Sequence, residues 1–138
     1  MTAYTTLVEA PLQKVWEHLI EKIENPQNFV PGVSEVEILE KTSDYVIRQM
    51  KVTTPESSVI LKEKITFVPY KVRFLLMDHP ALEGYVDNDA RAISDTQTEL
   101  TYTMHWIDKA TQTEKSKLEM VQSAVLKTKE FIEKSWKK

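Results

Sequence analysis

The chain has 138 residues, of which 41% are hydrophobic and 28% are charged, as in an ordinary globular protein. It contains no cysteine, which excludes disulfide bonds, thiolate metal sites and cysteine nucleophiles. Its formal net charge of −3 argues against nucleic acid as a partner, and no apolar run approaches the ~20 residues of a membrane span. The N-terminus lacks the basic region and apolar core of a signal peptide. We therefore expect a cytoplasmic protein with one domain over residues 1–138 and no membrane contact.

The N-terminal part of the sequence predicts a strand and then a helix. Ala3–Glu9 is rich in β-forming residues. Apolar residues then recur at three- and four-residue spacing from Pro11 onward, namely Leu12, Val15, Trp16, Leu19, Ile20 and Ile23. This helix is expected to end near residue 24, because the residue before Pro26 is disfavoured in the helical region. The following segment, residues 27–32, has room for a helical turn only.

The hydrophobic pattern changes to a period of two from Val33 onward. Six candidate strands follow: Val33–Glu40, Tyr45–Val52, Val59–Val68, Val72–Met77, Gly84–Ile93 and Glu99–Ile107. The connections between them are short and turn-like, whereas a parallel pair needs a crossover of a dozen or more residues. The pattern therefore predicts an antiparallel meander, which the N-terminal strand extends to seven strands.

Residues Gln112–Lys138 contain neither glycine nor proline and predict one long helix. The centre of its apolar stripe is made of small residues, Val121, Ala124 and Thr128, with bulkier ones at the edges. Such a helix either approaches its partner closely or leaves room for a ligand. Because an antiparallel sheet with one apolar face needs a cover, the predicted fold class is α+β. A curved seven-stranded antiparallel sheet wraps around the long C-terminal helix, with one shorter helix and a helical turn between strands 1 and 2.

Sequence motifs of common metal and cofactor sites are absent. The three histidines, His18, His79 and His105, do not have metal-binding spacing, so we expect no metal site. The only two glycines, Gly32 and Gly84, belong to neither a phosphate-binding loop nor a nucleophile elbow. The sequence therefore predicts no cofactor.

Four polar residues occur in phase with apolar positions of the predicted strands: Arg48, Glu63, Asn88 and Tyr102. An unpaired buried charge costs several kcal/mol. If these faces point inward, Arg48 and Glu63 therefore either pair with each other across strands or meet a ligand. A bulge that returns one charge to solvent is the remaining interpretation. If the four residues line a cavity, they are the few polar groups that orient a ligand in it.

Residues Val15–Val33 read V-W-E-H-L-I-E-K-I-E-N-P-Q-N-F-V-P-G-V. This stretch resembles the AtaL-like branch of the START/polyketide-cyclase (SRPBCC) superfamily, as do Val46-Ile47-Arg48 and Glu63-Lys64-Ile65 in the following strands. The order of predicted elements matches the helix-grip fold of that superfamily over the whole chain. The resemblance implies a deep, largely apolar cavity between the sheet and the last helix. Members of the superfamily bind or transform lipids, sterols, polyketides and other hydrophobic molecules.

The expected function is the binding of a small hydrophobic molecule, lipid-, polyketide- or aromatic-like, in this cavity. The side chains expected to contact it are Phe29, Arg48, Glu63, Asn88, Tyr102, Met104, Trp106, Val121, Ala124, Val125 and Thr128. One alternative is an enzyme of the cyclase, dehydratase or isomerase type, with Glu63 as general base and Arg48 or Tyr102 stabilising an enolate. Another is a module that binds a protein or a membrane surface. The sequence leaves open whether the protein is a monomer or a homodimer.

Overall fold

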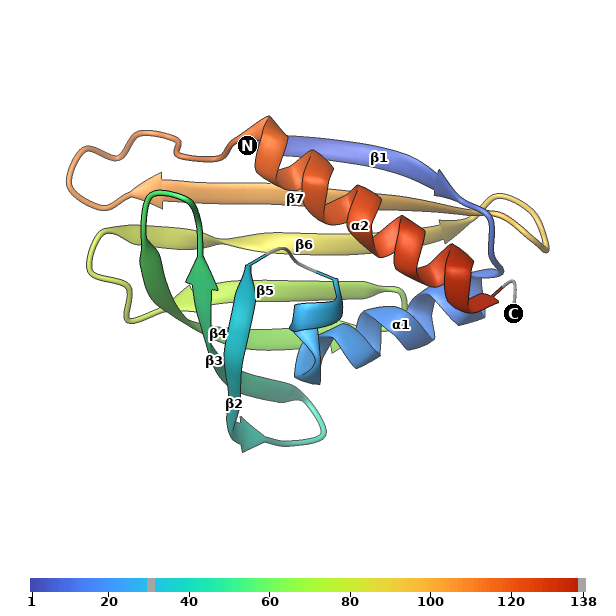
Figure 1. The fold of residues 1–138 in the computed structure, drawn as a ribbon, viewed down its shortest axis with the longest axis horizontal. Helices are drawn as coiled ribbons and strands as arrows, with labels where there is room; N and C mark the ends of the chain where they lie inside the picture. The colour runs from blue at the N-terminus through green and yellow to red at the C-terminus, as the bar shows by residue number, and fades with distance from the viewer. Residues whose placement is uncertain (30–31, 137–138) are drawn as a thin grey trace.

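The computed structural model describes residues 1–29 and 32–136, which form a curved antiparallel sheet with its helices on one face (Figure 1). The strands are β1 (Thr2–Val8), β2 (Val33–Lys41), β3 (Tyr45–Thr53), β4 (Ser58–Val68), β5 (Lys71–Met77), β6 (Leu82–Ala92) and β7 (Thr98–Asp108). The helices are α1 (Leu12–Glu24), the short 3-10 helix η1 (Pro26–Asn28) and the long α2 (Leu118–Trp136). The strand order is β1-β7-β6-β5-β4-β3-β2, with every neighbouring pair antiparallel. This architecture confirms the predicted α+β fold.

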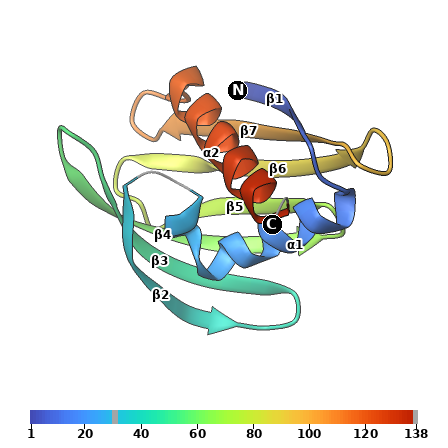
Figure 2. The same ribbon diagram turned by 45° about the vertical axis from the view of Figure 1, so that its right-hand side comes forward.

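The two helices share the concave face of the sheet, where α2 lies against β1 and β7 and α1 lies against β6 (Figure 2). Four residues of α2 at three- and four-residue spacing are buried there: Val121, Val125, Thr128 and Ile132. Val121, Val125 and Ile132 join one continuous core with Val15, Leu19 and Ile23 of α1 and with the inward side chains of the central strands. Leu118, by contrast, is half exposed, so the first turn of α2 projects beyond this core.

The last helix begins later than the sequence indicates. Residues 112–117 were expected to be helical, but they run beside the end of β7 instead, where Glu114 forms an antiparallel bridge with Ile107. The Ser116 hydroxyl accepts a hydrogen bond from the Trp106 N–H (3.1 Å) and donates one to the Met104 carbonyl (2.9 Å). These bonds to a neighbouring strand replace the first turns of the helix. The other end of the expected helix, Lys137 and Lys138, lies outside the described residues.

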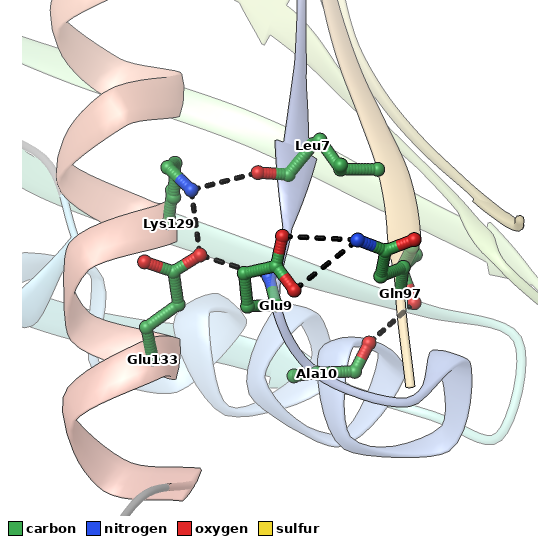
Figure 3. Close-up of polar contacts among 7 residues, drawn as sticks. Leu7, Glu9, Ala10, Gln97, Lys129 and Glu133 are labelled. Carbon is green, nitrogen blue, oxygen red and sulfur yellow. Dashed lines mark hydrogen bonds and ion pairs between the residues drawn. The ribbon is translucent and has the colours of Figure 1, made fainter. Parts of the chain in front are cut away.

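A polar cluster fixes the C-terminal half of α2 to the end of β1 (Figure 3). The Lys129 ammonium donates to the Leu7 carbonyl (2.7 Å) and to the Glu133 carboxylate (2.6 Å). Glu133 in turn accepts the backbone N–H of Glu9 at 2.8 Å. The two α2 residues in this cluster, Lys129 and Glu133, belong to the second half of the helix. The cluster therefore holds that half and includes no residue of the first half. The candidate site lies under that first half.

Candidate functional site

A cavity of about 140 Å³, partly open to solvent, lies between the concave face of the sheet and the first half of α2. Its lining residues are Lys22, Arg48, Met50, Val52, Leu61, Glu63, Phe74, Val86, Tyr102, Met104, Trp106, Met120, Val121 and Ala124. Apart from Lys22, Arg48 and Glu63, these are apolar or aromatic side chains. An apolar wall with a few polar groups is typical of a small-molecule site.

Seven of the eleven side chains named from the sequence line this cavity: Arg48, Glu63, Tyr102, Met104, Trp106, Val121 and Ala124. The other four are buried but are not among the lining residues. Phe29 is fully buried against Phe131, with ring centroids 4.7 Å apart, and Val125 belongs to the core beneath α2. Asn88 and Thr128 belong to a hydrogen-bond network beside the cavity. A direct role in ligand binding stays a prediction for all eleven.

Arg48 and Glu63 face each other directly on β3 and β4, and both are buried. Arg48 Nη2 donates to Glu63 Oε1 at 2.6 Å. Arg48 Nη1 donates to the carbonyls of Lys22 (3.1 Å) and Ile23 (2.8 Å), at the C-terminal end of α1. The cross-strand pair is therefore present, and it also satisfies two of the carbonyls that a helix C-terminus leaves without an intrahelical partner.

Lys22 is the site residue that the sequence interpretation missed. It lies three positions after Leu19 and seven after Val15, so it belongs to the buried stripe of α1, and its exposed fraction is only 4%. Its Nζ donates to Asn88 Oδ1 at 2.6 Å and to the Tyr102 hydroxyl at 3.0 Å. The spacing of Lys22 from Val15 and Leu19 indicated a buried position, but lysine is usually exposed to solvent, so the residue was not selected.

The hydrogen bonds beyond Lys22 have a fixed direction. The Thr128 hydroxyl donates to the Ala124 carbonyl of the preceding helical turn at 2.9 Å. Because Thr128 has a single hydroxyl proton, Tyr102 must donate to Thr128 across their 2.7 Å contact. The Tyr102 oxygen is then left to accept from Lys22. Lys22 is thus a donor to both of its partners.

Burial determines the protonation of this network. Desolvation by burial and, to a smaller extent, the nearby Arg48 charge lower the pKa of Lys22, Glu63 acts in the opposite sense, and the net pKa is about 7. Desolvation by burial also raises the pKa of Tyr102. Near neutral pH a large share of Lys22 is therefore a neutral amine, whereas Tyr102 keeps its proton.

Two side chains that line the cavity carry buried N–H groups without a hydrogen-bond partner among the described residues, Arg48 Nε and Trp106 Nε1. Buried donors of this kind are costly unless they are satisfied. Each of these donors would be satisfied by an acceptor oxygen, either of a ligand or of an ordered water.

The histidines do not gather at this site. His18 Nδ1 bonds the Lys14 carbonyl, His79 Nδ1 accepts two backbone N–H groups of its own loop, and His105 lies beside Glu114. In the described part of the chain, no three side chains of histidine, aspartate or glutamate are placed to hold a metal ion.

The charges on the surface of α2 matter for the alternative in which the protein binds a membrane surface. Lys129 and Lys134 pair with Glu133 and Glu130 one turn away, which offsets part of the positive charge of the helix. Within residues 1–29 and 32–136, neither helix is long and apolar enough to span a bilayer.

A curved sheet that grips a long helix over an apolar cavity defines the helix-grip class, and comparisons with known proteins agree. The Zhui aromatase/cyclase from Streptomyces sp. R1128 superposes with a TM-score of 0.71 at 18% identity, over 96% of this chain and 88% of that one. A START superfamily protein from Mycobacterium smegmatis gives a TM-score of 0.74 at 10% identity, over 98% and 95%. At these identities the likeness shows the fold.

The sequence assigns the chain to a family within this class. The sequence model of AtaL, described as acetylaranotin biosynthesis cluster protein L, matches residues 8–137, and the chain belongs to this family. The resemblance seen in the sequence is thereby confirmed. No curated protein matches the chain in sequence.

We expect Tyr102→Phe to lower the free energy of unfolding by about 1–2 kcal/mol, because it removes the hydroxyl that joins Lys22 to Thr128 in a buried network. Urea denaturation measures the change. Tyr4→Phe is the matched control, since Tyr4 lies directly opposite Tyr102 on β1, is partly buried, and has no side-chain hydrogen bond among the described residues. Equal losses in the two variants would show that the network contributes nothing beyond packing.

Proposed function

We propose that this protein binds a small, mostly apolar molecule with an acceptor oxygen in the cavity between the sheet and α2. The observation that carries the proposal is the combination of an apolar wall with the unpartnered donors Arg48 Nε and Trp106 Nε1. A core cavity of about 150 Å³ can hold benzene, so the enclosed space suits one aromatic ring or a short chain. A longer ligand would extend through the opening. The START superfamily and aromatase/cyclase relatives support this class of ligand.

Filling the cavity tests this proposal. Ala124 is a half-buried lining residue of α2, and Ala124→Phe is expected to place a ring in the space that the ligand needs. Native mass spectrometry should show a retained small molecule in the wild type and none in the variant. Titration with benzyl alcohol, followed by calorimetry, should give at least a tenfold loss of affinity. The free energy of unfolding should change little, because an empty space is filled.

The control for this experiment is Leu126→Phe, which adds the same ring on the exposed side of α2. It should bind benzyl alcohol as the wild type does. Retained binding in Ala124→Phe would contradict the proposal. A loss of about 1–3 kcal/mol in stability, as overpacking of a filled core produces, would show that no cavity exists there.

Catalysis in the same cavity is a second candidate function, and one observation favours it. Lys22 is a lining residue of the apolar cavity, whereas the Glu63 carboxylate already accepts a hydrogen bond from Arg48. The amine is therefore a stronger candidate for a reactive group than the carboxylate that the sequence indicated. The role of Glu63 as a general base stays untested.

A further inference from the structure

The surroundings of Lys22 differ from those of an ordinary structural lysine. A buried ammonium usually has a carboxylate partner or a full set of acceptors. Among the described residues, no carboxylate lies within 4.0 Å of Lys22 Nζ. The charged side chains that influence its pKa are Arg48 on β3 and Glu63 on β4, and these two are paired with each other.

The hydrogen bonds of Lys22 match a neutral amine. A neutral amine has two N–H groups and one lone pair, whereas an ammonium has three N–H groups. Lys22 Nζ donates to two acceptors, Asn88 Oδ1 and the Tyr102 oxygen, and no third acceptor occurs among the described residues. The two N–H groups of the neutral form are thus both used, and its lone pair is left without a donor. A third proton would have no hydrogen-bond acceptor there, only the faces of the Phe74 and Tyr102 rings, whose centroids lie 4.9 and 4.1 Å from Nζ.

We propose that Lys22 reacts as a nucleophile and forms an imine with an aldehyde or ketone bound in the cavity. This inference rests on the proposed function, because the carbonyl compound has to occupy the same space. It explains the unused lone pair by giving it an electrophilic carbon. Arg48 and Trp106, which line the same cavity, each carry a buried N–H group without a partner among the described residues.

The proposed step balances without any oxidant, reductant or cofactor. The Nζ lone pair forms a bond to the carbonyl carbon, and the carbonyl oxygen takes up a proton as its π bond breaks. The carbinolamine then loses the C–O bond, so that the two amine protons and the oxygen leave as one water molecule. A neutral nucleophilic lysine is what desolvation in an apolar pocket provides.

The groups that face Lys22 define the pH dependence of this reaction. They are Arg48 on β3, Glu63 on β4 and Tyr102 on β7, and the residue that α2 contributes to the network, Thr128, does not titrate. Burial lowers the pKa of Lys22 from 10.5 to about 7. Imine formation should therefore rise through about pH 7, whereas exposed lysines require much more alkaline conditions.

Reductive trapping tests the inference on the full chain. The protein is incubated with benzaldehyde and sodium cyanoborohydride between pH 5.5 and 8.5, and the adducts are located by peptide mapping. We expect one benzyl group on Lys22, with half-maximal labelling near pH 7. The α-amino group of Met1 also reacts near neutral pH, and mapping separates its peptide from that of Lys22. Lys22→Met should lose the Lys22 adduct, whereas Lys117→Met, which changes an exposed lysine, should keep it.

The outcomes separate the imine from the proposed function. Benzyl alcohol has an oxygen acceptor but cannot form an imine, so it reports binding alone. If benzyl alcohol binds and Lys22 stays unlabelled, the imine is wrong and the binding function stands. If labelling is spread over exposed lysines, the imine at Lys22 is likewise wrong. If benzyl alcohol and benzaldehyde both fail to bind, both proposals fail. An adduct on Lys22 that Ala124→Phe prevents supports both the imine and the binding function. Because the adduct is mapped in the wild type, this result does not depend on the folding of Lys22→Met.

Discussion

The free energy of unfolding should rise by several kcal/mol between pH 7 and pH 10 in the wild type and stay nearly constant in Lys22→Met. In the unfolded chain Lys22 has its ordinary pKa of 10.5, whereas in the folded protein its pKa is about 7. Between these values the unfolded state binds a proton that the folded state does not, so stability increases with pH. Each pH unit contributes up to about 1.4 kcal/mol. Below about pH 7 both states are protonated, and the penalty for burying the charge is constant.

The upper limit of this window is set by tyrosine. Burial raises the pKa of Tyr102, so above about pH 10 the unfolded phenol ionises first and stability falls again. Urea denaturation of the wild type and Lys22→Met at intervals from pH 6 to pH 10 measures the effect. Lys117→Met should follow the wild type, because its lysine is exposed in both states. Parallel curves for the wild type and Lys22→Met would mean that Lys22 is charged in the folded protein.

The sheet was predictable from local patterns alone. A period of two, broken by short turn-like segments, located all the strands from β2 to β7 to within about two residues, and short links imposed antiparallel pairing. The start of α2 was not predictable in this way. Ser116 has no local feature that forbids a helix; its hydroxyl is held by the backbone of β7 through Met104 and Trp106. Contacts with a strand several residues earlier outweighed helix propensity there.

The site was predictable to the extent that its residues obey strand alternation. Arg48 and Glu63 were found because each occupies an inward position on its strand, and their pairing was one of the alternatives left open. Lys22 was missed because its burial depends on two distant partners. Asn88 and Tyr102, which accept its hydrogen bonds, lie 66 and 80 positions away in the sequence. Phe29 was named as a ligand contact from the sequence alone. Its ring packs on Phe131 of α2, and it is not among the lining residues of the cavity.

Removing one partner of the Arg48–Glu63 pair should lower the free energy of unfolding by about 3–5 kcal/mol, because the remaining charge is left buried without compensation. Arg48→Met also leaves two carbonyls at the end of α1 without a donor. Urea denaturation of Arg48→Met and Glu63→Leu measures the single effects. The double variant should recover much of the loss, since it removes both charges and replaces them with apolar side chains.

The chain contains a matched control for this cycle. Arg91 and Glu99 also face each other across adjacent strands, with Nη2 and Oε1 3.0 Å apart, but the arginine side chain is 71% exposed. Arg91→Met and Glu99→Leu should each change stability by less than about 1 kcal/mol and show little coupling. Equal effects at the two pairs would mean that burial does not strengthen the Arg48–Glu63 interaction.

The Arg48–Glu63 pair also acts on Lys22, whose pKa Arg48 lowers and Glu63 raises. Arg48→Met should therefore shift the Lys22 titration to higher pH and Glu63→Leu to lower pH, so the ion pair that anchors α1 also tunes the amine in the cavity.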